Sequence, residues 1–176
     1  MPGYRLDMST SRPEAMKGIR RFDQGTKLDK IDKMLMAELA VDARLPNNAL
    51  ADRVGIAQST CSMRLQRLRD VGAIRGYHAD LSLEALGHPI QAMIAVRLQP
   101  NARANIGGYA CRLAKLPGVL NVYWLAGSVD FLIQVATESP DALRQFVTGH
   151  LSEPQEFTTT ETTLVFDHVR GDLQVS

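Results

Sequence analysis

One side of the segment 57–69 combines arginines with short polar side chains, a mixture that suits contact with base edges and phosphates. On a helical wheel of about 100° per residue, Cys61, Leu65 and Leu68 fall in one narrow sector, which we expect to be buried. Small side chains on the opposite side would let the helix enter a major groove, where arginine can form paired hydrogen bonds with guanine. The candidate DNA contacts on this helix are Gln58, Ser59, Thr60, Ser62, Met63, Arg64 and Arg67. Many exposed helices carry arginine and serine, so a plain solvent-exposed face is the alternative.

Two earlier helices are expected to hold this segment in place. The first is predicted from apolar residues at three- and four-residue spacing, Leu28, Ile31, Leu35 and Leu39. Its charged side is expected to face water and comprises Asp29, Lys30, Asp32, Lys33 and Glu38. After a break at Pro46, a short second helix is predicted over 47–54, and Gly55 supplies the left-handed residue that ends it. The third helix is expected to begin near Ala57 or Gln58.

The residues after the third helix predict a small appendage and a connector. Within 73–79, Ile74 and Tyr77 alternate with polar residues, which indicates a short strand or wing from which Arg75 can reach a phosphate. Residues 26–79 are therefore expected to form a winged helix–turn–helix domain, preceded by a flexible tail over 1–25. Residues 80–89 are expected to link it to a second domain.

Charge is unevenly divided along the chain. Residues 1–80 contain 14 Lys and Arg against 10 Asp and Glu, whereas residues 81–176 contain 6 against 9. This mild asymmetry favours two domains, of which only the first faces a polyanion. The basic residues of the tail could touch phosphates, or the tail could have no role at all.

Cysteine content and hydropathy narrow the class of protein. Cys61 and Cys111 lack the spacing of a zinc site, so we expect two free thiols, no metal and no cofactor. The first 25 residues lack the apolar core of a signal peptide. No apolar run approaches the roughly 18–20 residues that span a bilayer, so a soluble, cytoplasmic protein is expected.

From Ile90 onward the spacing of apolar residues changes, and segments typical of strands alternate with segments typical of helices. Strands are predicted over 90–98, 119–125, 130–136 and 157–169, and helices over 106–116 and 140–151. The second helix has a strong start, because Ser139 can cap it and Pro140 fits its first turn. This order predicts a ferredoxin-like βαββαβ domain over 90–170, with both helices on one face of an antiparallel sheet. The other face is apolar enough that self-association is expected to cover it.

Five segments of the chain resemble the Lrp/AsnC family of bacterial and archaeal transcription regulators. They are LDKIDKMLMAEL, LADRVGIAQSTCSMRLQRL, GAIRGYHA, LPGVLNVYWLAGSVDFLIQV and TETTLVFDHVR, in this order, and the resemblance covers residues 27–170. It implies a winged helix–turn–helix that binds double-stranded DNA, followed by a ferredoxin-like domain that binds a small effector, commonly an amino acid. It also implies a homodimer formed through the second domain, often assembled further into an octamer.

The resemblance places the effector near a loop between two strands. The residues it implies for effector binding are Trp124, Gly127, Ser128, Val129, Asp130, Thr160 and Thr162. A glycine loop can offer backbone groups to a carboxylate, and Asp130 could receive an α-amino group. The alternative for Asp130 is a turn-stabilising aspartate that bonds its own loop.

The chain departs from the family pattern at three places. Pro46 and Ala49 stand where the family has a capping box, which leaves Asn47 as the available cap for the second helix. Ala57 replaces the serine that usually opens the recognition helix, and losing such a cap costs about 1 kcal/mol. Trp124 is bulkier than the aliphatic residue expected there, which predicts a smaller or altered effector pocket.

The leading hypothesis is therefore a sequence-specific DNA-binding transcription regulator. A second hypothesis is an enzyme similar to the sirohaem decarboxylases, which share this two-domain plan. Such chemistry would need histidines around one cavity, but the four histidines of this chain are scattered and expected to share no face: His78, His88, His150 and His168. The sequence also shows no Ser/His/Asp set, pair of acids or phosphate-binding loop, so we expect no enzymatic activity. The third is an architectural or ligand-sensing protein that binds DNA without sequence preference.

Overall fold

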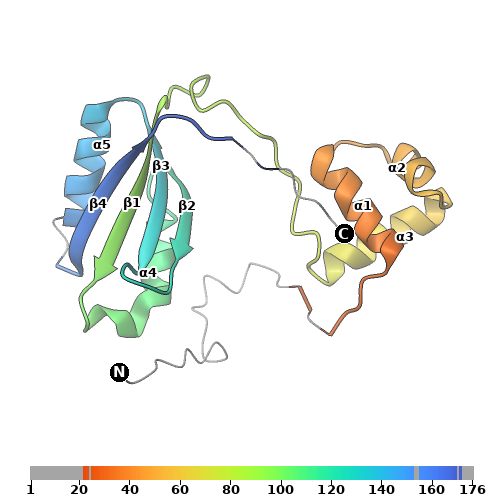
Figure 1. Ribbon diagram of the computed structural model, residues 1–176, viewed down its shortest axis with the longest axis horizontal. Helices are drawn as coiled ribbons and strands as arrows, with labels where there is room; N and C mark the ends of the chain where they lie inside the picture. The colour runs from red at the N-terminus through yellow and green to blue at the C-terminus, as the bar shows by residue number, and fades with distance from the viewer. Residues whose placement is uncertain (1–21, 24, 153–154, 170, 172–176) are drawn as a thin grey trace. The chain divides into compact units, whose positions relative to one another are not determined.

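A computed structural model describes residues 22–23, 25–152, 155–169 and 171. The chain divides between Asp80 and Leu81 into two compact units, which are described separately (Figure 1). The tail predicted over 1–25 lies largely outside the described residues, as does the segment 171–176, which follows the predicted ferredoxin-like domain and is expected to be a second tail. Asp23 belongs to the described part of the N-terminal tail, and its backbone N–H donates to the carbonyl of Val71 at 3.0 Å.

The N-terminal unit is built from three helices, α1 (Lys30–Val41), α2 (Asn47–Val54) and α3 (Gln58–Asp70). Each contributes apolar residues to one core, including Leu35 of α1, Leu50 of α2 and Leu68 of α3. The predicted buried seam of α3 is confirmed, because Cys61, Leu65 and Leu68 are all buried. Gly55 ends α2 with φ 73°, in the left-handed region as predicted. The sequence pattern therefore located both helices of the helix–turn–helix.

Three local expectations for this unit were wrong. Asp32 is fully buried instead of facing water, because two arginines of α3 neutralise it. Asn47 is the first residue of α2 and not its cap; Pro46 holds the cap position without a side-chain hydrogen bond. The segment 73–79 forms a mostly exposed loop, with Arg75 at its surface, instead of a strand. Among the described residues of this unit there is no strand to pair with it, and an isolated strand is not stable in water.

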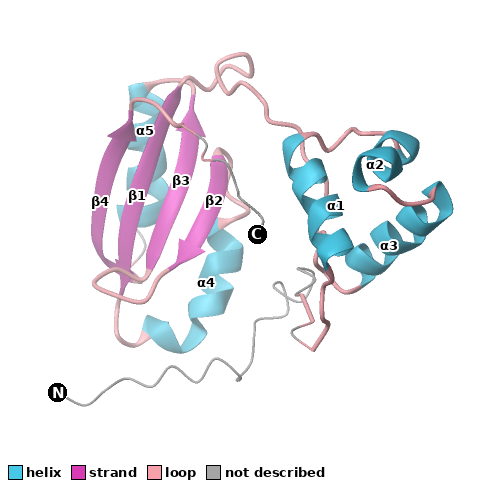
Figure 2. Ribbon diagram, turned by 45° about the vertical axis from the view of Figure 1, so that its right-hand side comes forward, coloured by secondary structure: helices cyan, strands magenta, loops and turns pink. Residues whose placement is uncertain are grey.

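The C-terminal unit contains a four-stranded antiparallel sheet with strand order β2-β3-β1-β4. Its elements in chain order are β1 (Ile90–Leu98), η2 (Ala102–Asn105), α4 (Ile106–Leu113), β2 (Val119–Trp124), β3 (Phe131–Thr137), α5 (Pro140–Val147), the π-helical turn η3 (Thr148–Ser152) and β4 (Phe157–Val165). Both α4 and α5 cover the same face of the sheet (Figures 1 and 2). The predicted ferredoxin-like arrangement is therefore confirmed.

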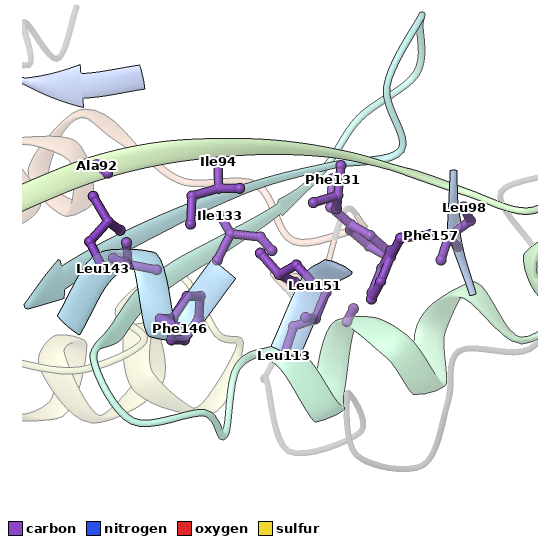
Figure 3. Packing of buried hydrophobic residues seen from close by; sticks show 13 residues of the cluster. Ala92, Ile94, Leu98, Leu113, Phe131, Ile133, Leu143, Phe146, Leu151 and Phe157 are labelled. Carbon is purple, nitrogen blue, oxygen red and sulfur yellow. The ribbon is translucent and has the colours of Figure 1, made fainter. Parts of the chain in front are cut away.

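The core of this unit lies between the sheet and its two helices. Alternate residues of β1, such as Ile94 and Val96, point toward the helices and are fully buried, as are Phe131 and Ile133 of β3. Figure 3 shows Ile94 and Ile133 on the side of the sheet that faces Leu143 and Phe146 of α5. Each such side chain contributes about 1.5–3 kcal/mol when it leaves water. This packing offsets the cost of Gly107 and Gly108 within α4, each of which weakens a helix by about 1 kcal/mol relative to alanine.

Two elements of this unit, α4 and β4, end earlier than predicted. The helix α4 stops at Leu113, and the strand β4 stops at Val165 instead of Val169. Val165 pairs with Gln91, next to the first residue of β1, so the residues beyond it have no partner strand. Among the described helices we find none with the length and apolar character needed to cross a bilayer.

Candidate functional site

The face of α3 that points away from the core carries the predicted DNA contacts. The exposed ones are Gln58, Ser59, Ser62, Met63 and Arg67, and Met63 is 66% exposed. Thr60 is half-buried beside them. The hydroxyl of Ser62 accepts a hydrogen bond from Asn47 Nδ2 at 3.2 Å, which ties α3 to the start of α2. This face is thus fixed by the core on one side and open to a partner on the other.

Arg64 and Arg67 are held by acids of α1. Arg64 Nη1 donates to Asp32 Oδ1 at 2.8 Å and to Asp29 Oδ2 at 2.7 Å. Arg67 Nη1 donates to Asp32 Oδ2 at 2.9 Å, and its Nη2 donates to the carbonyl of Lys27 at 3.1 Å. The side chains of Arg64 and Arg67 remain 25% and 45% exposed. Both predicted arginines therefore reach the surface from fixed positions.

The cluster of Asp29 and Asp32 with the two arginines also caps α1, and it shifts the pKa values of Asp29 and Arg64. Asp29 and Asp32 form a capping box, in which each side chain accepts the backbone N–H of the other residue. The backbone N–H of Asp32 and the Arg64 guanidinium together lower the pKa of Asp29. Hydrogen bonds to Asp29 and Asp32 raise the pKa of Arg64. Both shifts favour the charged forms of the Asp29–Arg64 ion pair.

The predicted effector residues are only partly brought together within one chain. Trp124 is 50% exposed at the end of β2, beside the exposed Gly127 and Ser128 of the following loop, with Val129 half-buried. The strand register places Trp124, Phe131, Val96 and Thr160 in one row across β2, β3, β1 and β4. Three strand spacings separate the two ends of this row, so Thr160 lies roughly 14 Å from Trp124.

The second predicted threonine lies further along β4. Thr162 pairs with Ile94, two residues beyond the Val96–Thr160 pair. A single small molecule cannot touch Trp124 and both threonines within one chain at these separations. The loop and the threonines therefore do not form one pocket in an isolated protomer.

The side chain of Asp130 bonds residues outside its own loop, contrary to the turn-stabilising alternative. Its carboxylate is nearly buried, at 9% residue exposure, and Oδ2 accepts the backbone N–H of Leu98 at 2.8 Å. Arg103 Nη2 donates to the same oxygen at 3.3 Å. The backbone N–H of Asp130 in turn donates to the carbonyl of Val96 at 3.0 Å. Asp130 thus fastens the hairpin loop to the end of β1.

Two shallow depressions gather polar side chains in the C-terminal unit. One, of about 330 Å³, is lined by His88, Glu138 and His150 among other residues. His88 and His150 therefore share a surface, contrary to the expectation that no two histidines would. His88 lies close to Glu138 because Ile90 pairs with Thr137. The other depression, of about 290 Å³, has Arg97, Arg103 and Thr159 in its lining.

Sequence reasoning missed Asp32, although a signal for it was present. Leu28, Asp32, Leu35 and Leu39 stand four, three and four residues apart, so Asp32 occupies the apolar stripe of α1. A charged residue on such a stripe requires a buried partner of opposite charge. The arginines of α3 were the available candidates in the same domain.

Comparison with protein families gives the same division of the chain. Residues 28–69 match the AsnC-type helix-turn-helix domain, and residues 91–174 match the Lrp/AsnC ligand binding domain. This pair of domains defines a helix–turn–helix regulator that also carries a ligand-binding domain. The chain belongs to the Lrp/AsnC family, and it is a DNA-binding transcription regulator.

Individual relatives agree with this assignment along most of their length. The chain is 41% identical over 169 residues to the HTH-type transcriptional regulator AldR of Mycobacterium tuberculosis, covering 96% of this chain and 94% of that protein. It is 36% identical to the leucine-responsive regulatory protein of Rhizobium meliloti, with coverage of 85% and 96%.

Two solved structures share both sequence and fold with the chain. The crystal structure of MtbAldR has 43% identity and a TM-score of 0.73, covering 82% of this chain and 95% of that one. A transcriptional regulator from Neisseria meningitidis, solved as a complex with L-Met, has 30% identity and a TM-score of 0.75, with coverage of 84% and 97%.

Proposed function

We propose that the protein is a sequence-specific regulator that binds DNA through α3 as a homodimer and responds to an amino acid. The observation that carries this proposal is the polar, open face of α3 in a helix–turn–helix that one chain joins to a ligand-binding domain. The proposed groove contacts are the seven residues of α3 from Gln58 to Arg67 named above, with Arg75 at a phosphate. A dimer would place two such helices on half-sites about 34–36 Å apart, or a multiple of this.

Binding of the full-length protein to its own upstream DNA and to a shuffled duplex tests the DNA-binding part. We expect tighter binding to the upstream DNA and a protected footprint there. Met63→Glu places a negative charge on the proposed face and should weaken this binding by about tenfold or more. Val41→Glu adds the same charge at an exposed position of α1 and serves as the matched control. Equal affinity for both duplexes would instead support an architectural role.

The face of the sheet that carries no helix supports the proposed dimer. Register places Met93, Ala95, Leu132 and Gln134 on this face, and all four are only half-buried although no described element covers them. Tyr123 pairs with Leu132 and extends the same surface. Burying such an apolar face against a second copy removes it from water. We further propose that dimers assemble to an octamer.

Substitution within this face tests the dimer. Leu132→Glu should convert the dimer to a monomer in sedimentation equilibrium, because burying an unpaired carboxylate in an apolar interface is strongly unfavourable. Leu86→Glu changes an exposed leucine of the same unit that lies outside the sheet, and it should leave the mass unchanged. A dimeric Leu132→Glu variant would place the interface elsewhere.

An amino acid is the proposed effector, and the loop from Trp124 to Asp130 is its proposed site. The complex of the Neisseria meningitidis relative with L-Met supports this class of ligand. Because Trp124 and Thr160 are roughly 14 Å apart in one chain, we propose that the ligand lies between copies and contacts the loop of one and other residues of its neighbour. A ligand bound there can act only through a difference in affinity between assemblies.

We propose regulation without catalysis. The relatives named above are regulators, which supports this reading. Incubation with a tetrapyrrole, followed by absorbance, should leave the spectrum unchanged. A time-dependent spectral change that requires His88 or His150 would contradict it.

A further inference from the structure

We infer that Asp32 is a positioning residue for DNA recognition: it touches no DNA, and it sets where the guanidinium groups of Arg64 and Arg67 stand on the reading face. This inference rests on the proposed DNA-binding function of α3 and adds to it a residue of α1.

The carboxylate of Asp32 has the geometry of a shared anchor. It is 0% exposed, and each of its two oxygens accepts a hydrogen bond from a different arginine: Oδ1 from Arg64 at 2.8 Å and Oδ2 from Arg67 at 2.9 Å. The backbone N–H of Asp29 also donates to Oδ2 at 3.2 Å. A buried carboxylate is tolerated only when it is paired and hydrogen-bonded, so the position of Asp32 dictates the positions of both partners.

The two arginines keep capacity for a second partner. A guanidinium carries five N–H donors in a rigid fork. The bonds described use Nη1 of Arg64, and Nη1 and Nη2 of Arg67, and both side chains still reach solvent. They project from the same helix as the exposed Gln58 and Ser59. A guanidinium already fixed by Asp32 meets a base or phosphate with less loss of conformational freedom than a free one.

A purely structural role for Asp32 predicts a different outcome. If the ion pairs only stabilise the fold, their loss should weaken binding to every DNA sequence together. If they position the arginines, release of the arginines should remove sequence preference while leaving nonspecific attraction to phosphate intact or stronger, because a negative charge has gone. The ratio of specific to nonspecific affinity therefore separates the two roles.

Asp32→Asn and Glu38→Gln form a matched pair for this test. Both remove one negative charge and one ion-pairing carboxylate from α1, but Glu38 pairs with Arg53 of α2 and not with the arginines of α3. Full-length proteins are compared on the upstream duplex and on its shuffled counterpart at several salt concentrations, with circular dichroism melts as the measure of folding.

Asp32→Asn should lower affinity for the upstream duplex by about tenfold or more, as for loss of one or two base contacts, while affinity for shuffled DNA stays the same or rises. Its salt dependence on shuffled DNA should steepen, because freed guanidiniums meet additional phosphates. Glu38→Gln should keep the specific affinity within about threefold, because it removes only a partly exposed ion pair. Parallel losses on both duplexes, or equal profiles for the two variants, would overturn the inference.

Arginine variants keep the test decisive if Asp32→Asn does not fold. Arg64→Lys and Arg67→Lys leave Asp32 ionised and paired but remove the rigid fork, so each should lose specific affinity and keep nonspecific affinity. Unchanged affinity of both variants for the upstream duplex overturns the inference. The wild-type protein decides the proposed function separately, since it must itself prefer the upstream duplex.

Discussion

The carboxylate of Asp130 accepts the backbone N–H of Leu98 at 2.8 Å, across 32 residues of sequence. This bond joins the loop after β2 to the last residue of β1, where β1 also changes register against β4. Backbone N–H groups at the end of a buried strand need a partner, and Asp130 supplies it here. The loop proposed to meet the effector is therefore rigid at one end.

Asp130→Ala should destabilise the C-terminal unit by about 1–3 kcal/mol, because it leaves the buried N–H of Leu98 without an acceptor. The measurement is urea unfolding followed by the fluorescence of Trp124, the single tryptophan of the chain. Glu84→Ala removes an exposed carboxylate from the same unit and should change stability by less than about 0.5 kcal/mol. Equal stability of the two variants would show that Leu98 finds another acceptor.

Gly118→Ala should also destabilise this unit. Gly118 has φ 79°, and a Cβ there would lie 2.6 Å from the carbonyl oxygen of Ala136. The left-handed backbone alone costs a non-glycine residue about 1–3 kcal/mol, and the close approach adds to this. Gly127→Ala is the control, because a Cβ at Gly127 meets nothing within 4 Å. Denaturation midpoints compare the two, and a stable Gly118→Ala variant would contradict the described turn.

Ala57→Ser should stabilise the N-terminal unit by about 1 kcal/mol. Ala57 has the extended backbone of a cap residue, φ −67° and ψ 145°, but no side chain that can accept a hydrogen bond from α3. Hydrogen exchange of α3 amides reports this gain directly, and Ala79→Ser in the exposed loop is the control. Unchanged protection in α3 would mean that water already satisfies its first N–H groups.

Acid should weaken the N-terminal unit through Asp29. Its pKa is lower in the folded state than in the unfolded chain, so its contribution to stability is complete above the ordinary carboxyl pKa of about 4. This contribution is lost as the pH falls through the depressed folded value. Amide signals of α1 followed by NMR during an acid titration should show the loss, and Asp29→Asn should remove this part of it. Identical acid profiles for both proteins would contradict the prediction.

Periodicity made much of the fold predictable. The buried seam of α3, the span of α2 and the order of strands follow from local patterns of apolar residues, which packing in each unit reinforces. Ser139 caps α5 as its sequence indicates, accepting the N–H of Ala142. Local chemistry was sufficient for these elements because the determining contacts lie within a few residues.

The errors arose where the determining contact is distant in sequence. Asp32 is buried only because Arg64 and Arg67 reach it from more than thirty residues away. Asp130 bonds Leu98 instead of its own loop for the same kind of reason. The end of β4 depends on where β1 begins, which the alternating residues after Val165 do not reveal. The positions of ion pairs and strand partners required the three-dimensional arrangement.

Trp124 offers a direct test of the proposed effector loop. Its indole is 50% exposed at the end of β2, so a ligand or a neighbouring copy that covers it should shift its emission to shorter wavelength. Titration with each standard amino acid other than tryptophan, which itself fluoresces, should give a saturable shift for one or a few of them. Because no other tryptophan contributes, the signal reports this loop alone.

The same titration on a variant separates binding at the loop from a distant effect. Gly127→Thr adds a side chain where a Cβ meets nothing within 4 Å, so the fold should persist while the effector-induced shift weakens or disappears. Binding to the upstream duplex should lose its response to that amino acid in parallel. An amino acid that alters DNA binding equally in both proteins, without moving Trp124 emission, would place the effector site elsewhere in the ligand-binding domain.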